Sequence, residues 1–327
     1  MTATAEREGQ GRAAAVEVVV RPLREDDLDV ADHLMRMAFG TYLKAPDPLQ
    51  VFGDADYVRT RFAAAPECAF AAELDGEVVG SNFATRWGSY AFFGPLTVRV
   101  DLWDRGIAGR LMEPVMELFD RWEVRQAALF TWPESPRHVH LYQRFGFWPQ
   151  QLTPLLSRPV ANPEAVEYST YGAVPPAQRE GIVEAARRLT DEIFEGLDVE
   201  RELVAAERLG LGETLLIQED SELSAFAVCH CGGDTEAGSG TCFVKFGAAR
   251  PGPSAPERFE RLLDACEAFA LERGLERLLV GMNTARHEAY RQLLARGFRT
   301  DLHGLAMLRP NEPAYNRPGV YVIDDLR

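Results

Sequence analysis

Residues 96–111, LTVRVDLWDRGIAGRL, are the most informative segment of the sequence. Its first residues predict a β-strand, a loop with Gly106 follows, and apolar residues from Ile107 onward recur at helical spacing. A strand, a glycine-containing loop and a helix in this order expose the free amides of a helix N-terminus to an anion. Gly106 and Ala108 let a phosphate approach the main chain, and Arg105 and Arg110 add positive charge. Such a loop alone is a weak signal, because glycines also serve structural turns.

A second motif, LYQRFGF at residues 141–147, follows a strand expected at 127–131 and a short helix. The two motifs, at this spacing, resemble those of the GNAT superfamily of N-acetyltransferases. In that superfamily a loop of the form Arg/Gln-x-x-Gly-x-Gly/Ala follows the fourth strand and binds a pyrophosphate. Trp103 stands where the family usually has Gln or Arg. The resemblance covers residues 16–150.

The resemblance implies acetyl-CoA as the cosubstrate. Its pantetheine arm would pair with the strand around residues 96–98, and its pyrophosphate would sit on the amides of residues 105–109. Ser135 occupies the position where an Asn commonly contacts the pantetheine. The expected cofactor-binding residues are therefore Leu96, Thr97, Val98, Asp104, Arg105, Gly106, Ile107, Ala108, Gly109 and Ser135.

Tyr142 matches the tyrosine that family members often use to protonate the departing CoA thiolate. A phenol with a pKa of about 10 suits a thiolate of similar basicity. The alternative is an amphipathic core residue. A general base is not visible, because residues 90–98 contain no carboxylate. Glu134, His138 and His140 are candidates, and a water relay or an acceptor amine that is already neutral stays open.

The first half of the chain shows regular patterns around these motifs. Leu28, Ala31, Leu34, Met35 and Phe39 predict a helix, and an Asp-Gly pair at 75–76 predicts a hairpin between strands 69–74 and 78–85. A third strand is expected at about 90–100. A helix from residue 107 contains a proline at 114, which predicts a kink or a local irregularity.

The order of elements then repeats over about 150 residues, which indicates an internal duplication. We expect an acetyl-CoA-binding domain at 15–152 and a degenerate copy at 166–310. The proline-rich stretch 149–163 predicts a linker, placed at 153–165. Residues 1–14 are predicted to be a disordered tail without a signal peptide or anchor, and 311–327 a C-terminal tail.

The second half lacks the functional residues. Aligning the two helices puts Glu257 opposite Gly106 and Phe259 opposite Ala108. A carboxylate and a bulky ring oppose phosphate binding, and Leu293 takes the place of Tyr142, with Tyr290 one helical turn away. We therefore predict one cofactor site per chain and a second domain that shapes the acceptor site or packs against the first.

Composition excludes several classes of function. The 327 residues carry a net charge of −15, which argues against nucleic-acid or anionic-lipid surfaces. The odd cysteine count favours a reduced, cytoplasmic protein. The sequence contains no stretch of about 18 apolar residues, so no membrane span is predicted. Cys229 and Cys231 flank His230 on a predicted strand, where packing is favoured over a metal site.

The sequence thus predicts an α/β (α+β type) fold of two tandem GNAT domains, each a mixed central sheet flanked by helices. The expected activity is acetyl transfer from acetyl-CoA to a small-molecule amine in the N-terminal domain, and the tandem arrangement resembles mycothiol synthase-like members. Alternatives are a non-catalytic acyl-CoA sensor, another acyl-CoA, or a protein N-terminus as acceptor. Acceptor contacts are expected from variable loops such as residues 42–57, and the oligomeric state is left open.

Overall fold

The computed structural model of the chain describes residues 17–161 and 163–326, so the tail predicted at 1–14 lies outside the described part. The elements of the N-terminal half are β1 (Val19–Pro22), α1 (Leu28–Tyr42), α2 (Tyr57–Ala64), β2 (Ala69–Leu74), β3 (Glu77–Trp87), β4 (Tyr90–Phe93), β5 (Thr97–Val98), α3 (Ile107–Arg121), β6 (Gln126–Thr131), α4 (Pro136–Gln143) and β7 (Trp148–Pro159). Those of the C-terminal half are β8 (Ser169–Thr170), α5 (Pro176–Ile193), α6 (Glu200–Arg208), β9 (Gly212–Glu219), β10 (Glu222–Gly232), β11 (Gly238–Ala249), α7 (Ala255–Glu272), β12 (Arg277–Gly281), α8 (His287–Ala295), β13 (Arg299–Arg309) and β14 (Val322–Ile323).

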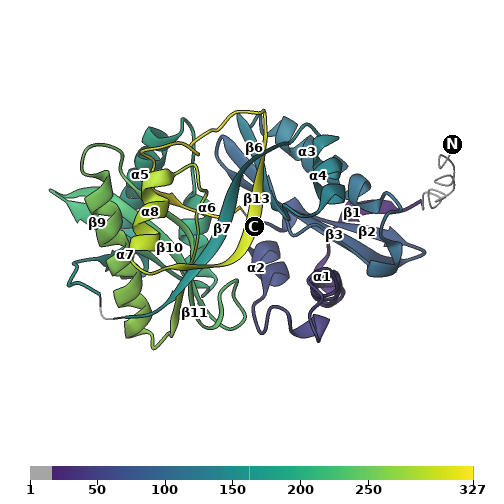
Figure 1. Cartoon of the computed structure of the whole chain (residues 1–327), viewed down its shortest axis with the longest axis horizontal. Coiled ribbons are helices and arrows are strands. Elements are labelled where there is room, and N and C mark those ends of the chain that lie inside the picture. Colours follow the sequence, from purple (N-terminus) through teal and green to yellow (C-terminus); the bar gives the residue numbers. More distant parts are fainter. Residues whose placement is uncertain (1–16, 162, 327) are drawn as a thin grey trace, which may run out of the picture.

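One continuous mixed sheet runs through both halves (Figure 1). Its order is β1-β2-β3-β4-β6-β13-β7-β12-β11-β10-β9-β8. The pairs β4–β6 and β11–β12 are parallel and the other neighbours along this path are antiparallel. The two halves are arranged alike around the central strands, which confirms the predicted α/β fold with a mixed sheet flanked by helices.

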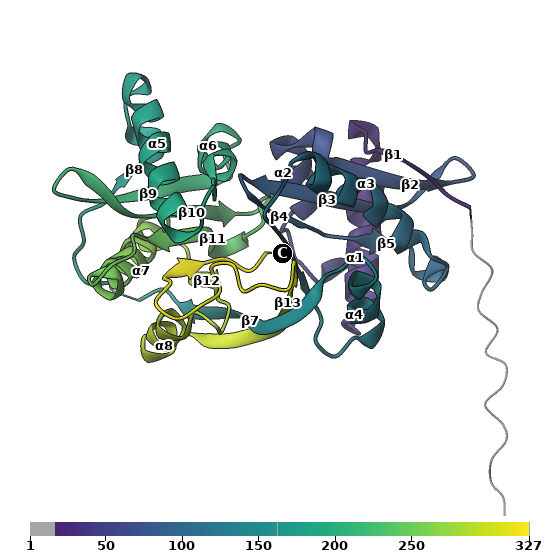
Figure 2. The ribbon, with the colours of Figure 1, turned by 90° about the horizontal axis from the view of Figure 1, so that it is seen from above.

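A long strand near the end of each half pairs with the other half. Strand β13 of the C-terminal half lies against β6, and β7 of the N-terminal half lies against β12. In Figures 1 and 2 these two strands run side by side between the halves. The predicted linker at 153–165 is therefore wrong up to Pro159, because those residues belong to β7. Its prolines suggested a linker, yet their carbonyls still accept hydrogen bonds, such as that of Pro154 from the Met282 amide at 3.1 Å.

Helices cover both faces of the sheet in the N-terminal half. Apolar side chains of α1 and α2 pack on one face of β2 and β3, and those of α3 pack on the other face. Helix α4 joins the cluster that α3 forms with β4 and β6. The hairpin between β2 and β3 has Asp75 at φ 52° and Gly76 at φ 84°, as the Asp-Gly pair predicted. The strand expected at 90–100 is divided, since β4 ends at Phe93 and β5 pairs with β3 instead. Helix α3 continues through Pro114.

The C-terminal segment is part of the core, so the tail predicted at 311–327 is wrong for its described residues. Strand β14 pairs with Gly247 and Ala248 of β11, and the Asp324 amide donates to the Gly281 carbonyl of β12 at 3.1 Å. Asp324 also forms a buried ion pair with Arg286 at 2.7 Å. Apolar residues of this segment pack between the halves, which is why it is held in place.

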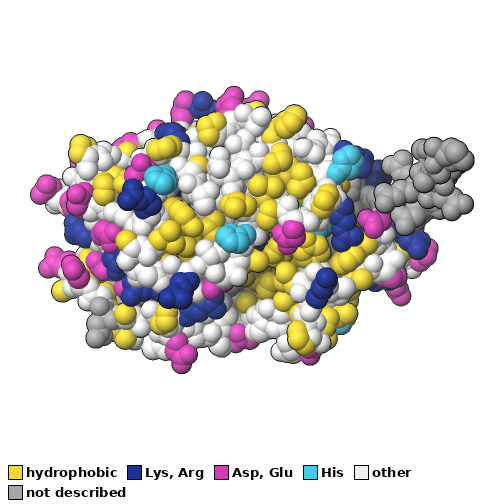
Figure 3. Space-filling view, viewed as in Figure 1, with side chains coloured by type: hydrophobic (Ala, Val, Ile, Leu, Met, Phe, Trp, Pro, Cys, Tyr) yellow, Lys and Arg dark blue, Asp and Glu magenta, His cyan; other side chains and the backbone are white. Residues whose placement is uncertain are grey.

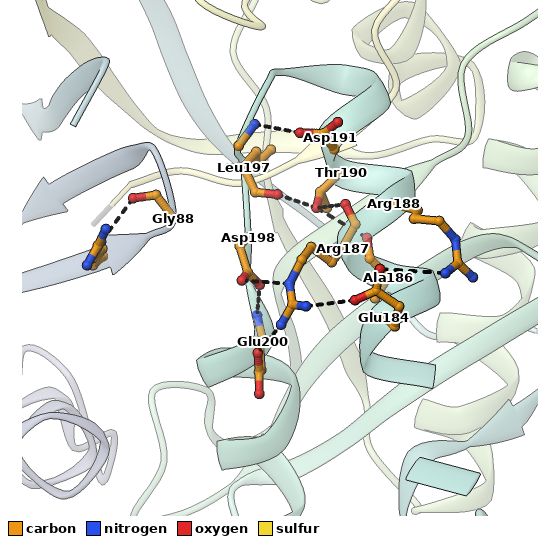
Figure 4. Close-up of polar contacts among 12 residues, drawn as sticks. Gly88, Glu184, Ala186, Arg187, Arg188, Thr190, Asp191, Leu197, Asp198 and Glu200 are labelled. Carbon is orange, nitrogen blue, oxygen red and sulfur yellow. Dashed lines mark hydrogen bonds and ion pairs between the residues drawn. The ribbon is translucent and has the colours of Figure 1, made fainter. Parts of the chain in front are cut away.

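A tight turn joins the two halves on a second side (Figure 4). The loop after α5 reaches the turn between β3 and β4, where the Ser89 amide donates to the Gly196 carbonyl at 2.7 Å. A Cβ on Gly88 would lie 2.1 Å from that carbonyl oxygen, and Gly88 has a φ of 63°. Arg187 holds this loop through Asp198 at 3.1 Å. Only glycine fits at position 88 without displacing the loop.

Across residues 17–161 and 163–326, none of the helices combines the length and apolar character that crossing a membrane requires.

Candidate active site

The candidate site lies where β4 and β6 separate. The two strands are paired from Tyr90 to Phe92, after which the chain leaves β6 and joins β3 as β5. A cavity of about 590 Å³ lies beside this gap. One wall comes from residues 93–98, another from 130–132, and the others from α1, α2, α4 and the loop before α3. A gap of this kind leaves a strand edge free for an extended ligand.

The loop before α3 fits a pyrophosphate. Gly106 is the N-cap of α3, has a φ of 86° and offers no side-chain cap to the first turn. The first amides of the helix therefore stay available to an anion. A Cβ built on Gly106 or Gly109 would meet nothing within 4 Å, so the surface above the loop is open. Arg105, Arg137 and Arg144 line the same cavity and add positive charge.

Trp103 has a structural role in this loop. Its indole N–H donates to the Val98 carbonyl at 2.8 Å, and the Arg137 guanidinium lies 4.5 Å from its ring centroid. Arg137 also pairs with Asp104 at 3.5 Å. The residue that departs from the family pattern thus fixes the loop to the strand and holds an arginine beside the cavity.

Most of the predicted cofactor residues line this one cavity. Thr97 and Ser135 are buried and do not line it. Thr97 faces the opposite side from its neighbours, because successive side chains of a strand alternate. Ser135 is the N-cap residue of α4. The predicted residues that line the cavity are Leu96, Val98, Asp104, Arg105, Gly106, Ile107, Ala108, Gly109 and Tyr142.

Tyr142 lies on α4 with 7% of its surface exposed and packs against Phe93, with ring centroids 5.6 Å apart. Burial raises its pKa well above the usual range, although a hydrogen bond with the Thr131 side chain opposes the rise. The phenol is therefore protonated at neutral pH and available as a proton donor at the cavity wall. Both predicted roles, packing and proton donation, are compatible with this position.

The candidate bases are placed differently. Glu134 is exposed and does not line the cavity. His140 lines it at the exposed end, and His138 lines it beside Tyr42, with ring centroids 5.4 Å apart. Burial, with the charge of Arg137 added, lowers the pKa of His138 to about 4. His138 is therefore neutral at pH 7 but only weakly basic.

The end of the cavity lined by α1 and the segment before α2 is aromatic, which the sequence showed only in part. The loop expected to supply contacts, residues 42–57, contributes Tyr42, Leu43, Phe52 and Tyr57. Phe39 on α1 and Trp132 after β6 were not predicted, because a helical stripe and a strand end are also typical of core residues. On the face shown in Figure 3, hydrophobic side chains gather over α1 and α2.

Arg61 connects this wall to the C-terminal half. It lines the cavity, donates to the Gly94 carbonyl and pairs with Glu236 at 3.1 Å, with side chains 5% and 2% exposed. Glu236 also pairs with Lys245 at 2.7 Å, and Lys245 lies 3.5 Å from Glu202. Burial pushes the pKa of Glu236 up, but Arg61 and Lys245 outweigh it and hold the pKa well below the usual range. We call these four residues the charge network.

The corresponding place in the C-terminal half is filled. When the two halves are aligned, buried Leu111 of α3 corresponds to buried Leu262 of α7. Helix α7 nevertheless begins about one turn earlier than α3 does in this alignment. That turn, which contains Glu257, replaces the open loop, and Phe259 packs in the core with no exposed surface. Beyond the residues that pair with β12, strand β11 pairs with β14, at the place where the N-terminal half has its cavity. The sequence did not indicate that β14 fills this place.

Two splayed parallel strands, an open helix N-terminus and a buried phenol define the class of an acyl-CoA-dependent transferase. Residues 29–147 match the sequence profile of the Acetyltransferase (GNAT) family. The match spans the cavity loop and Tyr142, so the chain contains an acetyltransferase domain of the GNAT type within residues 29–147. A search of curated protein sequences finds no significant match.

Solved structures show that the fold extends over the whole chain. A protein from Pyrococcus horikoshii described as an acetyltransferase is similar at a TM-score of 0.67 and 17% identity, covering 99% of each chain. A GCN5-related N-acetyltransferase from Sphaerobacter thermophilus has a TM-score of 0.55 and 15% identity, covering 89% of this chain and 95% of its own. A tandem GNAT protein from the clavulanic acid biosynthesis pathway has a TM-score of 0.57 and 13% identity, covering 89% and 98%.

Proposed function

We propose that the chain transfers an acetyl group from acetyl-CoA to the amine of a small molecule, and that the chemistry takes place in the N-terminal half. The observation that carries this proposal is the single continuous cavity that joins the loop at Gly106 to Tyr142. A mycothiol synthase-like organisation and a cytoplasmic location belong to the same proposal.

The residues of the cavity fit the parts of acetyl-CoA. The amides of residues 106–109 and the nearby arginines would hold the pyrophosphate, and the edge of residues 96–98 that faces the gap would pair with the pantetheine arm. Bound there, acetyl-CoA supplies a thioester-activated acetyl group. The backbone of Thr97 takes part through this strand even though its side chain faces away.

Tyr142 would complete the transfer. The amine nitrogen forms a bond to the acetyl carbon, the C–S bond breaks with its electron pair going to sulfur, and the Tyr142 phenol gives its proton to that sulfur. The proton lost by the amine passes to solvent, directly or through a water beside His138, and solvent restores the phenol. Among the described residues that line the cavity Asp104 is the only carboxylate, and it is paired with Arg137. We therefore assign no carboxylate base.

The C-terminal half would support this site without binding a second cofactor. It contributes Leu302 of β13 to the cavity and Glu236 to the charge network. Its own counterpart of the gap is filled by β14, and its counterpart of the loop is helical.

Calorimetry tests the proposal directly. We expect one acetyl-CoA per chain, and two equivalent sites would contradict the role given to the second half. Release of free CoA with a panel of small amines should then reveal turnover. Acetyl-CoA binding without CoA release for any amine would favour a non-catalytic sensor. A faster reaction with octanoyl-CoA would favour another acyl donor, and reaction only with a peptide N-terminus would favour a protein acceptor.

A further inference from the structure

Six rings form a continuous surface at the acceptor end of the cavity. We call Phe39, Tyr42, Phe52, Tyr57, Phe130 and Trp132 the aromatic wall, and all six line the cavity. Neighbouring centroids lie 5.4 Å apart for Phe52 and Tyr57, 5.6 Å for Phe39 and Phe52, and 6.5 Å for Phe39 and Trp132.

The rings hold one another edge-on or tilted. Tyr42 and Trp132 are tilted by 33° with centroids 5.4 Å apart, and Phe130 meets Trp132 edge-on at 6.3 Å. Residues from α1, the loop before α2, the first turn of α2 and the end of β6 thus form one surface. Such edge and tilted arrangements are those that aromatic rings prefer, and a further ring can extend them.

The charges around this wall do not suit a polycation. Arg61 lines the cavity with its guanidinium 5.7 Å from the Tyr57 ring centroid, and Glu236 and the Gly94 carbonyl already engage it. The sole carboxylate among the described lining residues, Asp104, lies on the cofactor loop and pairs with Arg137. Additional ammonium groups of an acceptor would lose water here without gaining a carboxylate partner.

Resting on the proposed function, we infer that the acceptor is a small primary amine that carries an aromatic ring, with the ring packed against the aromatic wall. A flexible alkyl amine would gain the same apolar burial but not the ring-to-ring geometry. A polyamine would in addition bury charges that the wall cannot pair.

Matched amines test this inference in the full-length protein. The affinities of 2-phenylethylamine, n-hexylamine and spermidine are measured by calorimetry, with and without free CoA, so neither turnover nor acetyl-CoA is needed. We expect 2-phenylethylamine to bind about three- to ten-fold more tightly than hexylamine, the range that ring-to-ring contacts provide. Spermidine should bind on the order of 100-fold more weakly.

Variants locate the preference on the wall. Trp132→Leu and Phe39→Leu should bring the ratio between the two monoamines close to one while acetyl-CoA affinity, which also reports folding, is kept. Trp148→Leu is the matched control, since this exposed tryptophan on β7 lies outside the cavity and its loss should leave the ratio unchanged.

The inference and the proposed function fail in different ways. Loss of acetyl-CoA binding would overturn the proposed function. Four outcomes with intact acetyl-CoA binding would overturn the inference alone. These are no binding of 2-phenylethylamine, equally tight binding of hexylamine, tighter binding of spermidine, and a ratio of the two monoamine affinities that stays unchanged in both wall variants.

Discussion

Replacing Glu236 by glutamine should destabilise the protein more than any exposed ion pair could. The change keeps the shape of the side chain and removes only its charge. Glu236 is 2% exposed, and its partners Arg61 and Lys245 are 5% and 10% exposed. Removing one partner of a buried pair costs about 3–5 kcal/mol, because the remaining charge is left buried.

The structure places this variant near the lower end of that range. Arg61 keeps its bond to the Gly94 carbonyl, and Lys245 keeps Glu202 at 3.5 Å. We therefore expect a loss of about 3 kcal/mol in the free energy of unfolding. Urea unfolding followed by tryptophan fluorescence measures it.

An exposed pair between the same two halves provides the control. Glu67 and Arg201 lie 3.1 Å apart with side chains more than half exposed, so Glu67→Gln should cost no more than about 1 kcal/mol. A Glu236→Gln protein as stable as Glu67→Gln would show that the buried charge of Glu236 does not stabilise the fold. Turnover should fall with Glu236→Gln, because Arg61 supports the cavity wall.

Four further changes probe separate features. Gly109→Glu should weaken acetyl-CoA binding at least ten-fold without loss of stability, because a carboxylate at the start of α3 repels the pyrophosphate but is favourable for the helix. Gly109→Ala is the control. Unchanged acetyl-CoA affinity in the glutamate variant would refute the loop assignment. Tyr142→Phe should lower kcat by ~10²–10⁴-fold with acetyl-CoA affinity intact, whereas Tyr290→Phe should turn over normally; full activity in Tyr142→Phe would exclude the proton donor. Gly88→Ala should cost about 1–3 kcal/mol or more, because its Cβ would meet the Gly196 carbonyl oxygen at 2.1 Å, while Gly76→Ala has open space and should cost less; equal losses would argue against the close approach. Burial and the charge of Lys245 lower the pKa of His230 to about 3, so the folded protein holds this side chain neutral. The free energy of unfolding should therefore fall as the pH drops from about 6.5 towards 3, by about 2 kcal/mol at about pH 5. His230→Leu should flatten this pH dependence, and an unchanged slope would contradict the assignment.

Local patterns were sufficient for the elements and for the loop. The hairpin at Asp75-Gly76, helix α1 and the strand-loop-helix at 96–111 depend on neighbouring residues, so periodicity and glycine positions predicted them. Glu257 and Phe259 likewise marked the second half as different, and its helix α7 indeed begins a turn early.

Patterns that depend on distant partners were missed. The prolines of β7 suggested a linker, because proline is typical of loops. The strands that pair with β7 come from residues 277–309, which are distant in the sequence. The charge network joins Arg61 to Glu236 across 175 positions of the chain, and charged residues in a sequence usually indicate surface.

Sequence patterns were enough to predict the type of domain, the candidate phosphate-binding loop and the candidate phenol, because each is encoded within one short segment. The exchange of β7 and β13 between the halves, the filling of the second gap by β14 and the meeting of six rings from three segments at one end of the cavity were visible only in the folded chain. Strand pairing and side-chain convergence depend on which distant surfaces bury each other, and no single segment carries that information.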